Sequence, residues 1–96
     1  MNLTFNDIKN IHKKIRHNVK WTETTFTSSI SEKLGIDTFL KLENRQHTGA
    51  FKIRGSYSKL LSLSEAEKKA GVVAMSAGNH AQGLAYISYL SLIHIS

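Results

Sequence analysis

Residues 72–83 read Val72-Val73-Ala74-Met75-Ser76-Ala77-Gly78-Asn79-His80-Ala81-Gln82-Gly83, an apolar run followed at once by a polar turn. The run predicts a short buried strand, and the turn predicts the start of a helix that continues to about Tyr89. Residues 38–42 predict another strand, and residues 50–63 predict a helix between the two. Strands that alternate with helices favour an α/β fold with a parallel sheet. Two strands form no sheet that is stable alone, so we expect an incomplete sheet.

Composition excludes several classes of protein. The 96 residues include no Cys and no Pro, with 13 Lys and Arg against 7 Asp and Glu, for a net charge of +6. A disulfide framework and a Cys-based metal site are therefore excluded, and no His and acidic residues have metal-ligand spacing. With no apolar leader and no uninterrupted run of about 20 apolar residues, we expect a cytoplasmic protein that does not enter the membrane.

Charge is unevenly distributed along the chain. Every Lys, Arg, Asp and Glu lies before residue 70, and residues 70–96 carry none of them. A charge-free segment of this kind is typical of elements that are covered on both faces. Too little chain remains to cover them, so the sequence looks cut short.

The N-terminal segment predicts an amphipathic helix. Thr4 and Asp7 have the spacing of a capping box. Four apolar residues then recur at helical spacing: Ile8, Ile11, Ile15 and Val19. Four basic residues lie largely off that stripe: Lys9, Lys13, Lys14 and Arg16. The basic cluster is interpreted as a solvated helix face or as a phosphate contact; no aromatic interleaving or nucleic-acid motif supports the second interpretation.

Between these segments the sequence predicts loops and short helices. Residues 21–31 are rich in Thr and Ser and predict a loop that leads to a short helix at residues 31–34, ended by Gly35. In the helix at residues 50–63, the candidates for packing are Phe51, Tyr57, Leu60 and Leu61. Residues 64–67 form a second capping box, and Gly71 should end the turn that follows.

One group of residues with chemical potential is Thr48-Gly49-Ala50-Phe51-Lys52-Ile53-Arg54-Gly55. Lys52 lies near a helix start, where the helix dipole and burial would both lower its pKa, and such a Lys is suited to form a Schiff base with a carbonyl. Small neighbours would let a planar cofactor approach the backbone. The alternative is an exposed Lys on an amphipathic helix.

A second group is residues 76–83, which follow the expected strand directly. Free backbone N–H groups at a helix start suit a carboxylate or phosphate, and Ser76, Asn79 and His80 can add side-chain hydrogen bonds. The alternative is a helix cap with a polar turn and a His80 satisfied in the core. The segment is no G-x-G-x-x-G, and Ser76 is not in a G-x-S-x-G elbow, so neither a dinucleotide nor a nucleophilic serine is indicated.

Together these motifs resemble a known family. Residues 41–44 and 48–55 resemble the cofactor-lysine motif of fold-type II pyridoxal-phosphate enzymes, whose fold is tryptophan synthase β-like. Residues 76–83 resemble the substrate-carboxylate loop of the threonine dehydratase branch, closest to its short catabolic form. The resemblance covers about residues 5–88, and members of this family are much longer. We therefore expect residues 1–89 to be the N-terminal part of a catalytic, cofactor-binding domain, and residues 90–96 to be a non-matching tail.

The resemblance implies a function for individual residues. Lys52 would hold pyridoxal 5'-phosphate and then remove the α-proton, Phe51 would pack beside the pyridine ring, and Asn79 would bond its phenolic oxygen. The substrate carboxylate would be held by Ser76, Gly78, Asn79 and His80. The implied reaction is dehydration and deamination of L-threonine or L-serine to 2-oxobutanoate or pyruvate and ammonia. Without the rest of the domain, the 96-residue chain is expected to bind the cofactor weakly and to be inactive.

The resemblance also implies alternatives and partners. Serine racemases of this family carry a Ser where this chain has Ala77, so dehydration is favoured over racemisation. The catabolic branch suggests an AMP effector near His47, Thr48 and Gln82, although His47 replaces the usual Arg. The full-length protein is expected to be a homo-oligomer. An inert truncated product, or a basic nucleic-acid-binding module, are the remaining alternatives.

Overall fold

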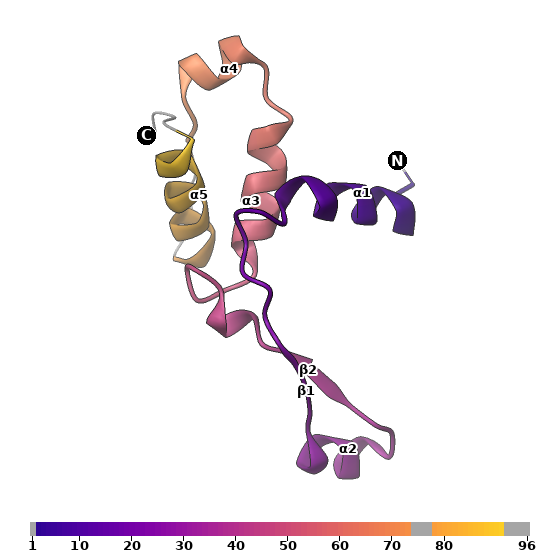
Figure 1. The fold of residues 1–96 in the computed structure, drawn as a ribbon. Helices are drawn as coiled ribbons and strands as arrows, with labels where there is room; N and C mark the ends of the chain where they lie inside the picture. The colour runs from indigo at the N-terminus through magenta and orange to yellow at the C-terminus, as the bar shows by residue number, and fades with distance from the viewer. Residues whose placement is uncertain (1, 74–77, 92–96) are drawn as a thin grey trace.

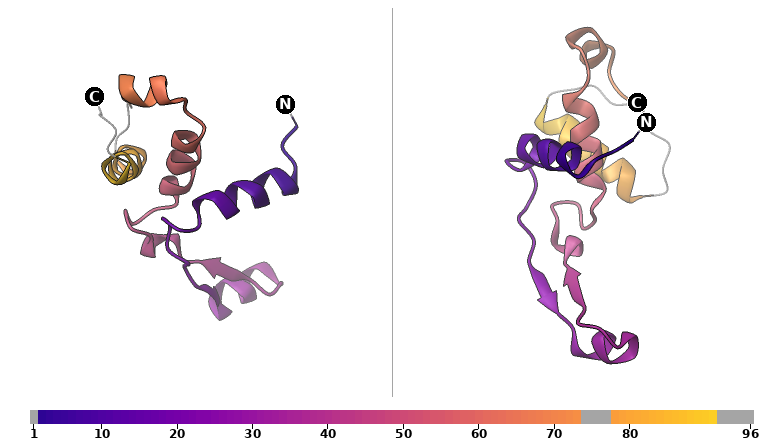
Figure 2. Two further views of the ribbon diagram at one scale, coloured as in Figure 1. Left: turned by 45° about the horizontal axis from the view of Figure 1, so that its top comes forward. Right: turned by 90° about the vertical axis from the view of Figure 1, so that its right-hand side faces the viewer.

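The computed structural model describes residues 2–73 and 78–91. Its elements in chain order are α1 (Phe5–Ile15), β1 (Thr24–Phe26), α2 (Ser28–Leu34), β2 (Phe39–Lys41), the 3-10 helix η1 (Glu43–Arg45), α3 (Lys52–Leu61), α4 (Glu65–Ala70) and α5 (Asn79–Leu90). Figures 1 and 2 show α3 and α5 side by side, α1 against α3, and the β1–β2 pair projecting away with α2 at its tip. The molecule is elongated, with extents of 51 × 29 × 24 Å.

The core lies where α3 meets α5 and the end of α1. Its buried apolar residues are Ile15, Val19, Ile53, Leu60, Leu84 and Ile87. Within the N-terminal stripe, only Ile15 and Val19 are buried, whereas Ile8 and Ile11 remain exposed. The reason is that α1 crosses α3 near its own C-terminal end, so its first turns pass beyond the core (Figure 2).

Helix boundaries follow local capping. Both predicted capping boxes form, at Thr4 with Asp7 and at Ser64 with Glu67. Gly35 ends α2 in the left-handed region, with φ of 73°, where a residue without a Cβ avoids strain. Gly71 follows the last residue of α4, as expected.

The prediction of a loop at residues 21–31 is wrong in part, because residues 24–26 form β1 and α2 begins at Ser28. β-branched Thr side chains suit an extended backbone, and the β1 segment pairs antiparallel with β2 in the register Thr24 to Lys41 and Phe26 to Phe39. The rings of Phe26 and Phe39 meet edge to face with centroids 5.6 Å apart. β2 itself was predicted, but the strands that are described make an antiparallel pair and not a parallel sheet.

The predicted helix at residues 50–63 is shorter, because α3 spans Lys52–Leu61. Leu60 is buried and Tyr57 packs on the core, as expected. The expectation that Phe51 and Leu61 pack is wrong: Phe51 precedes the first helical turn and is 59% exposed, and Leu61, at the end of α3, is 42% exposed.

The expected buried strand at residues 72–75 falls partly outside the described residues, which exclude Ala74 and Met75. Val72 packs against the core, but Val73 is 78% exposed. No other strand among the described residues covers Val73, so the predicted burial is absent there. In the described part of the chain, no helix is both long and apolar enough to cross a membrane.

Candidate cofactor and substrate site

The two motifs meet at the crossing of α3 and α5. A Cβ placed on Gly83 would lie 3.1 Å from the backbone nitrogen of Ile53 and 3.3 Å from the backbone carbonyl carbon of Lys52. Only a residue without a side chain allows this approach without moving a helix. The contact sets the first turns of α5, which begin at Asn79, against the start of α3, which begins at Lys52.

Lys52 occupies the first position of α3. Its Nζ lies 5.1 Å from the centroid of the Phe51 ring, a cation–π contact. The side chain is exposed, so the expected burial around Lys52 is not formed by the described residues. Among these residues no carboxylate makes an ion pair with it.

A polar network holds the chain that precedes Lys52. The carboxylate of Glu43 accepts hydrogen bonds from Arg54, from Thr22 Oγ1 at 2.7 Å and from Gln46 Nε2 at 3.1 Å. Burial alone raises the pKa of Glu43, but the hydrogen bonds from Arg54, Thr22 and Gln46 outweigh it and lower the pKa to about 2. The network joins η1 to α3 two residues after Lys52.

Gln46 extends this network to the N-terminal segment. Its side-chain oxygen accepts from the backbone N–H of Lys20 at 3.0 Å, and its Nε2 donates to the Lys20 carbonyl at 2.8 Å. Gln46 is buried, so the oxygen and the nitrogen of its side-chain amide both find hydrogen-bond partners where water has little access. The segment at residues 20–22 is thereby fixed beside the loop that leads to Lys52.

The loop between η1 and α3 contains two unusual features. Gly49 has φ of 76°, a conformation that strains any residue with a side chain. Thr48 Oγ1 is buried and has no hydrogen-bond partner among the residues that the structure describes. A buried hydroxyl without a partner is costly, and it is a polar group that a bound ligand could satisfy.

The start of α5 brings further polar groups close to the first turns of α3. Asn79 is exposed on the first turn, and His80 Nδ1 lies 3.5 Å from the buried hydroxyl of Ser56 on α3. The backbone N–H of Gln82 donates to the Gly78 carbonyl at 3.0 Å, which closes the first turn of the helix. The predicted carboxylate ligand Ser76 lies outside the described residues.

The three predicted AMP residues lie near one another. The ring of His47 stacks on Tyr86 with centroids 5.0 Å apart and planes 19° apart. Tyr86 and Gln82 are four residues apart on α5 and therefore share a face of that helix. Thr48 follows His47 directly. The loop and α5 thus form one surface at these residues.

Comparison with known proteins identifies the family. Residues 15–92, most of the chain, match the family described as pyridoxal-phosphate dependent enzyme. The chain belongs to this family. Residues 90–92 lie within the match, and the expected non-matching tail at residues 90–96 stays a prediction.

Two curated relatives of this pyridoxal-phosphate dependent chain are lyases. It is 51% identical over 83 residues to the L-threonine ammonia-lyase of Thermotoga maritima, a match that covers 86% of this chain and 21% of the relative. It is 45% identical over 82 residues to the catabolic L-threonine dehydratase of Escherichia coli, covering 85% of this chain and 25% of the relative. The chain therefore spans about a quarter of the length of the curated relatives that it matches.

The fold is confirmed by solved structures. The crystal structure of serine racemase from Dictyostelium discoideum superposes with a TM-score of 0.87 at 40% identity, covering 97% of this chain and 31% of that one. The chain thus has the fold-type II architecture of these enzymes over the part that it contains. The antiparallel β1–β2 pair belongs to that architecture.

The residues at the site suit the cofactor of the family. Lys52 offers an exposed amino group, Gly83 lets α5 lie against the backbone at the start of α3, and Thr48 offers a buried hydroxyl without a partner among the described residues. Among the described residues, no group of three or more His, Asp or Glu side chains could hold a metal ion.

Sequence reasoning missed the residues that support the site. Thr22, Glu43 and Gln46 were not predicted to act together, although Glu43 lies in the stretch that carried the resemblance. Thr22 is 21 residues from Glu43 in the chain, so no short spacing reveals that contact. The usable signal was the three-residue separation of Glu43 and Gln46, which suits a contact within one helical turn.

Proposed function

We propose that this chain is the N-terminal part of a pyridoxal-phosphate-dependent lyase that removes the β-hydroxyl and then ammonia from L-threonine and L-serine. The products are 2-oxobutanoate and pyruvate, each with ammonia. The contact of Gly83 with the backbone of Ile53 carries the proposal, because it brings the start of α3, where Lys52 lies, against the first turns of α5. The two lyases named above, which share 51% and 45% of the matched residues, support it.

In this proposal three residues from the two motifs hold the cofactor. Lys52 Nζ holds the cofactor covalently and, once released, takes the α-proton of the substrate. Phe51, exposed beside Lys52, packs against the pyridine ring, and Asn79 donates to the phenolic oxygen. Bound pyridoxal phosphate supplies an electron sink for the pair of electrons left on the α-carbon.

The second motif binds the substrate carboxylate. α5 is twelve residues long, and the backbone N–H groups of its first turn attract an anion. We assign the carboxylate to Ser76, Gly78, Asn79 and His80. His80 Nδ1 lies 3.5 Å from Ser56 Oγ, so the imidazole already faces α3 without a substrate.

Schiff-base trapping tests the role of Lys52. The 96-residue chain is incubated with pyridoxal phosphate, reduced with borohydride and digested, and the labelled peptide is found by mass spectrometry. We expect the label on Lys52, its loss in K52A, and its retention in K59A, which removes another exposed Lys of α3. Equal labelling of many lysines would contradict the assignment.

Activity is expected only from a longer protein. The chain spans about a quarter of its relatives' length, and we expect the 96-residue chain alone to give no 2-oxobutanoate from L-threonine. Joining it to the remainder of a relative's catalytic domain should restore production, and K52A should abolish it. Turnover by the 96-residue chain alone would refute the expected inactivity but not the proposed role of Lys52.

Serine racemisation is the second candidate, favoured by the TM-score of 0.87 to a serine racemase. Ala77, which lies outside the described residues, has no hydroxyl that could deliver a proton to the opposite face of the α-carbon. We therefore expect the joined protein to form pyruvate from L-serine with little D-serine, and A77S to increase the D-serine fraction. Chiral chromatography of the products distinguishes the two reactions.

We further propose an AMP effector site at His47, Thr48 and Gln82. The stack of His47 on Tyr86 and the unpartnered hydroxyl of Thr48 support it. Equilibrium dialysis with AMP should detect binding that Q82A weakens. A cytoplasmic location and a homo-oligomeric full-length protein stay predictions.

A further inference from the structure

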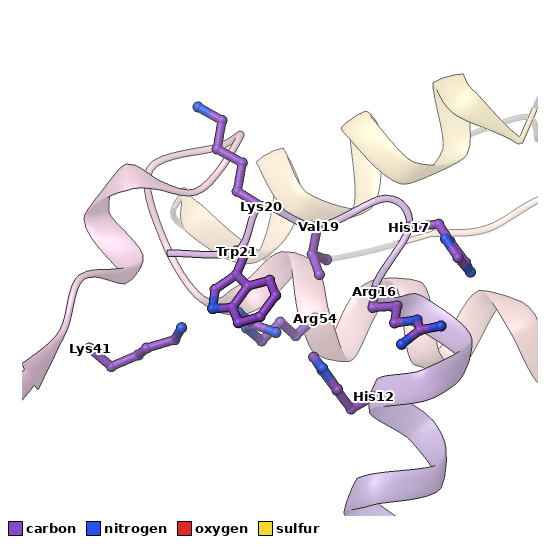
Figure 3. A pocket seen from close by; sticks show the side chains of 8 residues that line it. All are labelled: His12, Arg16, His17, Val19, Lys20, Trp21, Lys41 and Arg54. Atoms are coloured by element: carbon purple, nitrogen blue, oxygen red, sulfur yellow. The ribbon is translucent and has the colours of Figure 1, made fainter. Parts of the chain in front are cut away.

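A pocket separate from the candidate cofactor site lies at the junction of the C-terminal end of α1, residues 17–21 and α3 (Figure 3). Its volume is about 620 Å³, within the range of small-molecule sites. None of its lining residues is among those proposed above to hold the cofactor, the substrate or AMP. The pocket therefore needs an explanation of its own.

The lining is strongly cationic, and none of the residues that line it is acidic. In the described part of the chain, Arg16 makes no ion pair. Lys41 Nζ donates to the carbonyl of Thr22, which uses one of its three donors. Arg54 makes an ion pair with Glu43 through Nε, so the unpaired charges of the pocket come from Arg16 and Lys41. Such a concave basic surface concentrates anions.

An aromatic platform lies among these cations. Trp21 is the only Trp of the sequence and is 98% exposed. Figure 3 shows its indole with Lys41 on one side and His12 and Arg16 on the other, while Lys20 points away. An indole face accessible to solvent can stack on a heteroaromatic ring, and such stacking tolerates any base because every base has a π-face.

We propose that this pocket binds a nucleoside polyphosphate, with its base stacked on Trp21 and its phosphates on the unpaired cations Arg16 and Lys41. Inorganic phosphate alone would leave the indole face unused, and a nucleoside alone would leave the cations unpaired. A nucleic acid strand is a different proposal, since it would also engage the basic residues of α1 that lie outside the pocket.

The fluorescence of Trp21 reports binding directly, because no other Trp interferes. Titration of the 96-residue chain with ATP should give saturable quenching. Tripolyphosphate should bind at least five-fold more weakly than ATP, and adenosine should give no saturable signal. Quenching that never saturates, or equal affinity for tripolyphosphate, would overturn the proposal.

Two matched variants distinguish binding in the pocket from a general effect of positive charge on ATP binding. R16Q/K41Q and the control K9Q/K13Q remove the same two charges, but Lys9 and Lys13 lie on α1 outside the pocket. We expect the first to weaken ATP binding at least ten-fold and the control less than two-fold. Equal weakening of ATP binding by the two variants would refute the pocket. So would an RNA oligonucleotide that binds the parent more tightly than ATP and whose binding K9Q/K13Q also abolishes.

Calorimetry with W21A tests the stacking without fluorescence. Affinity for ATP should fall at least ten-fold, and affinity for tripolyphosphate should be unchanged. Circular dichroism confirms that each variant is folded. A W21A chain that binds ATP as tightly as the parent would exclude the role of the indole. The result is independent of Schiff-base trapping at Lys52, so the two proposals can fail separately.

Discussion

Gly83 on α5 lies directly against the backbone of Ile53 on α3, where an added Cβ would be 3.1 Å from the amide nitrogen and 3.2 Å from Cα. Ile53 is completely buried and follows Lys52 in the chain. The separation of the two helices is thus fixed at the residue next to the proposed cofactor lysine. A change at Gly83 therefore affects both the stability of the core and the geometry of the site.

G83A should destabilise the protein by about 1–3 kcal/mol, because the added methyl group forces α3 and α5 apart by a few tenths of an ångström. Urea unfolding followed by circular dichroism measures the change. G55A is the matched control, since an added Cβ at Gly55 meets nothing within 4 Å and Ala favours the helix by up to about 1 kcal/mol. Equal stability of G83A and the parent would show that the crossing is loose.

The ionised carboxylate of Glu43 should make stability depend on pH. Hydrogen bonds from Arg54, Thr22 and Gln46 lower its pKa to about 2, against 4.5 ordinarily. The stabilisation is fully present above pH 4.5 and is lost as the pH falls from 4.5 towards 2, where the folded state takes up the proton. E43Q should lose stability at pH 7 and show a shallower decline over this range.

The measurement is the urea midpoint at several pH values between 2 and 7. Asp7 and Glu67, whose pKa values are lowered by capping hydrogen bonds with Thr4 and Ser64, titrate in the same direction, so some decline remains in E43Q. E32Q changes an exposed Glu and serves as the control. Parallel curves for E43Q and the parent would exclude Glu43 as the cause.

Residues close in the chain were well predicted, and residues far apart were not. The capping boxes at Thr4 and Ser64 depend on groups three residues apart, so the sequence alone indicates them. β1 was missed because a Thr-rich segment forms a strand only when a partner such as β2 lies beside it. The proposed site residues Lys52 and Asn79 were assigned from motifs, but how near they lie depends on the packing of α3 against α5, which no short spacing in the sequence reveals.

Q46A should destabilise the protein by about 1–3 kcal/mol, since it removes hydrogen bonds to both backbone groups of Lys20 and leaves them unsatisfied at a poorly hydrated position. Amide hydrogen exchange should increase at residues 20–22 before it increases in α3. Q82A, at an exposed Gln of α5, should change neither stability nor exchange there. Unchanged exchange at Lys20 in Q46A would show that water replaces the amide without cost.

The loop that leads to Lys52 gives the last prediction. Gly49 has φ of 76°, so G49A should cost about 1 kcal/mol or more in stability, because an L-residue with a Cβ is strained there. If the loop relaxes to relieve that strain, the position of Lys52 changes as well, and borohydride trapping of pyridoxal phosphate at Lys52 should slow several-fold. G55A, also next to the motif but without positive φ, should trap at the parental rate. Parental rates of trapping in G49A, combined with reduced stability, would show that the loop supports the fold without orienting the lysine.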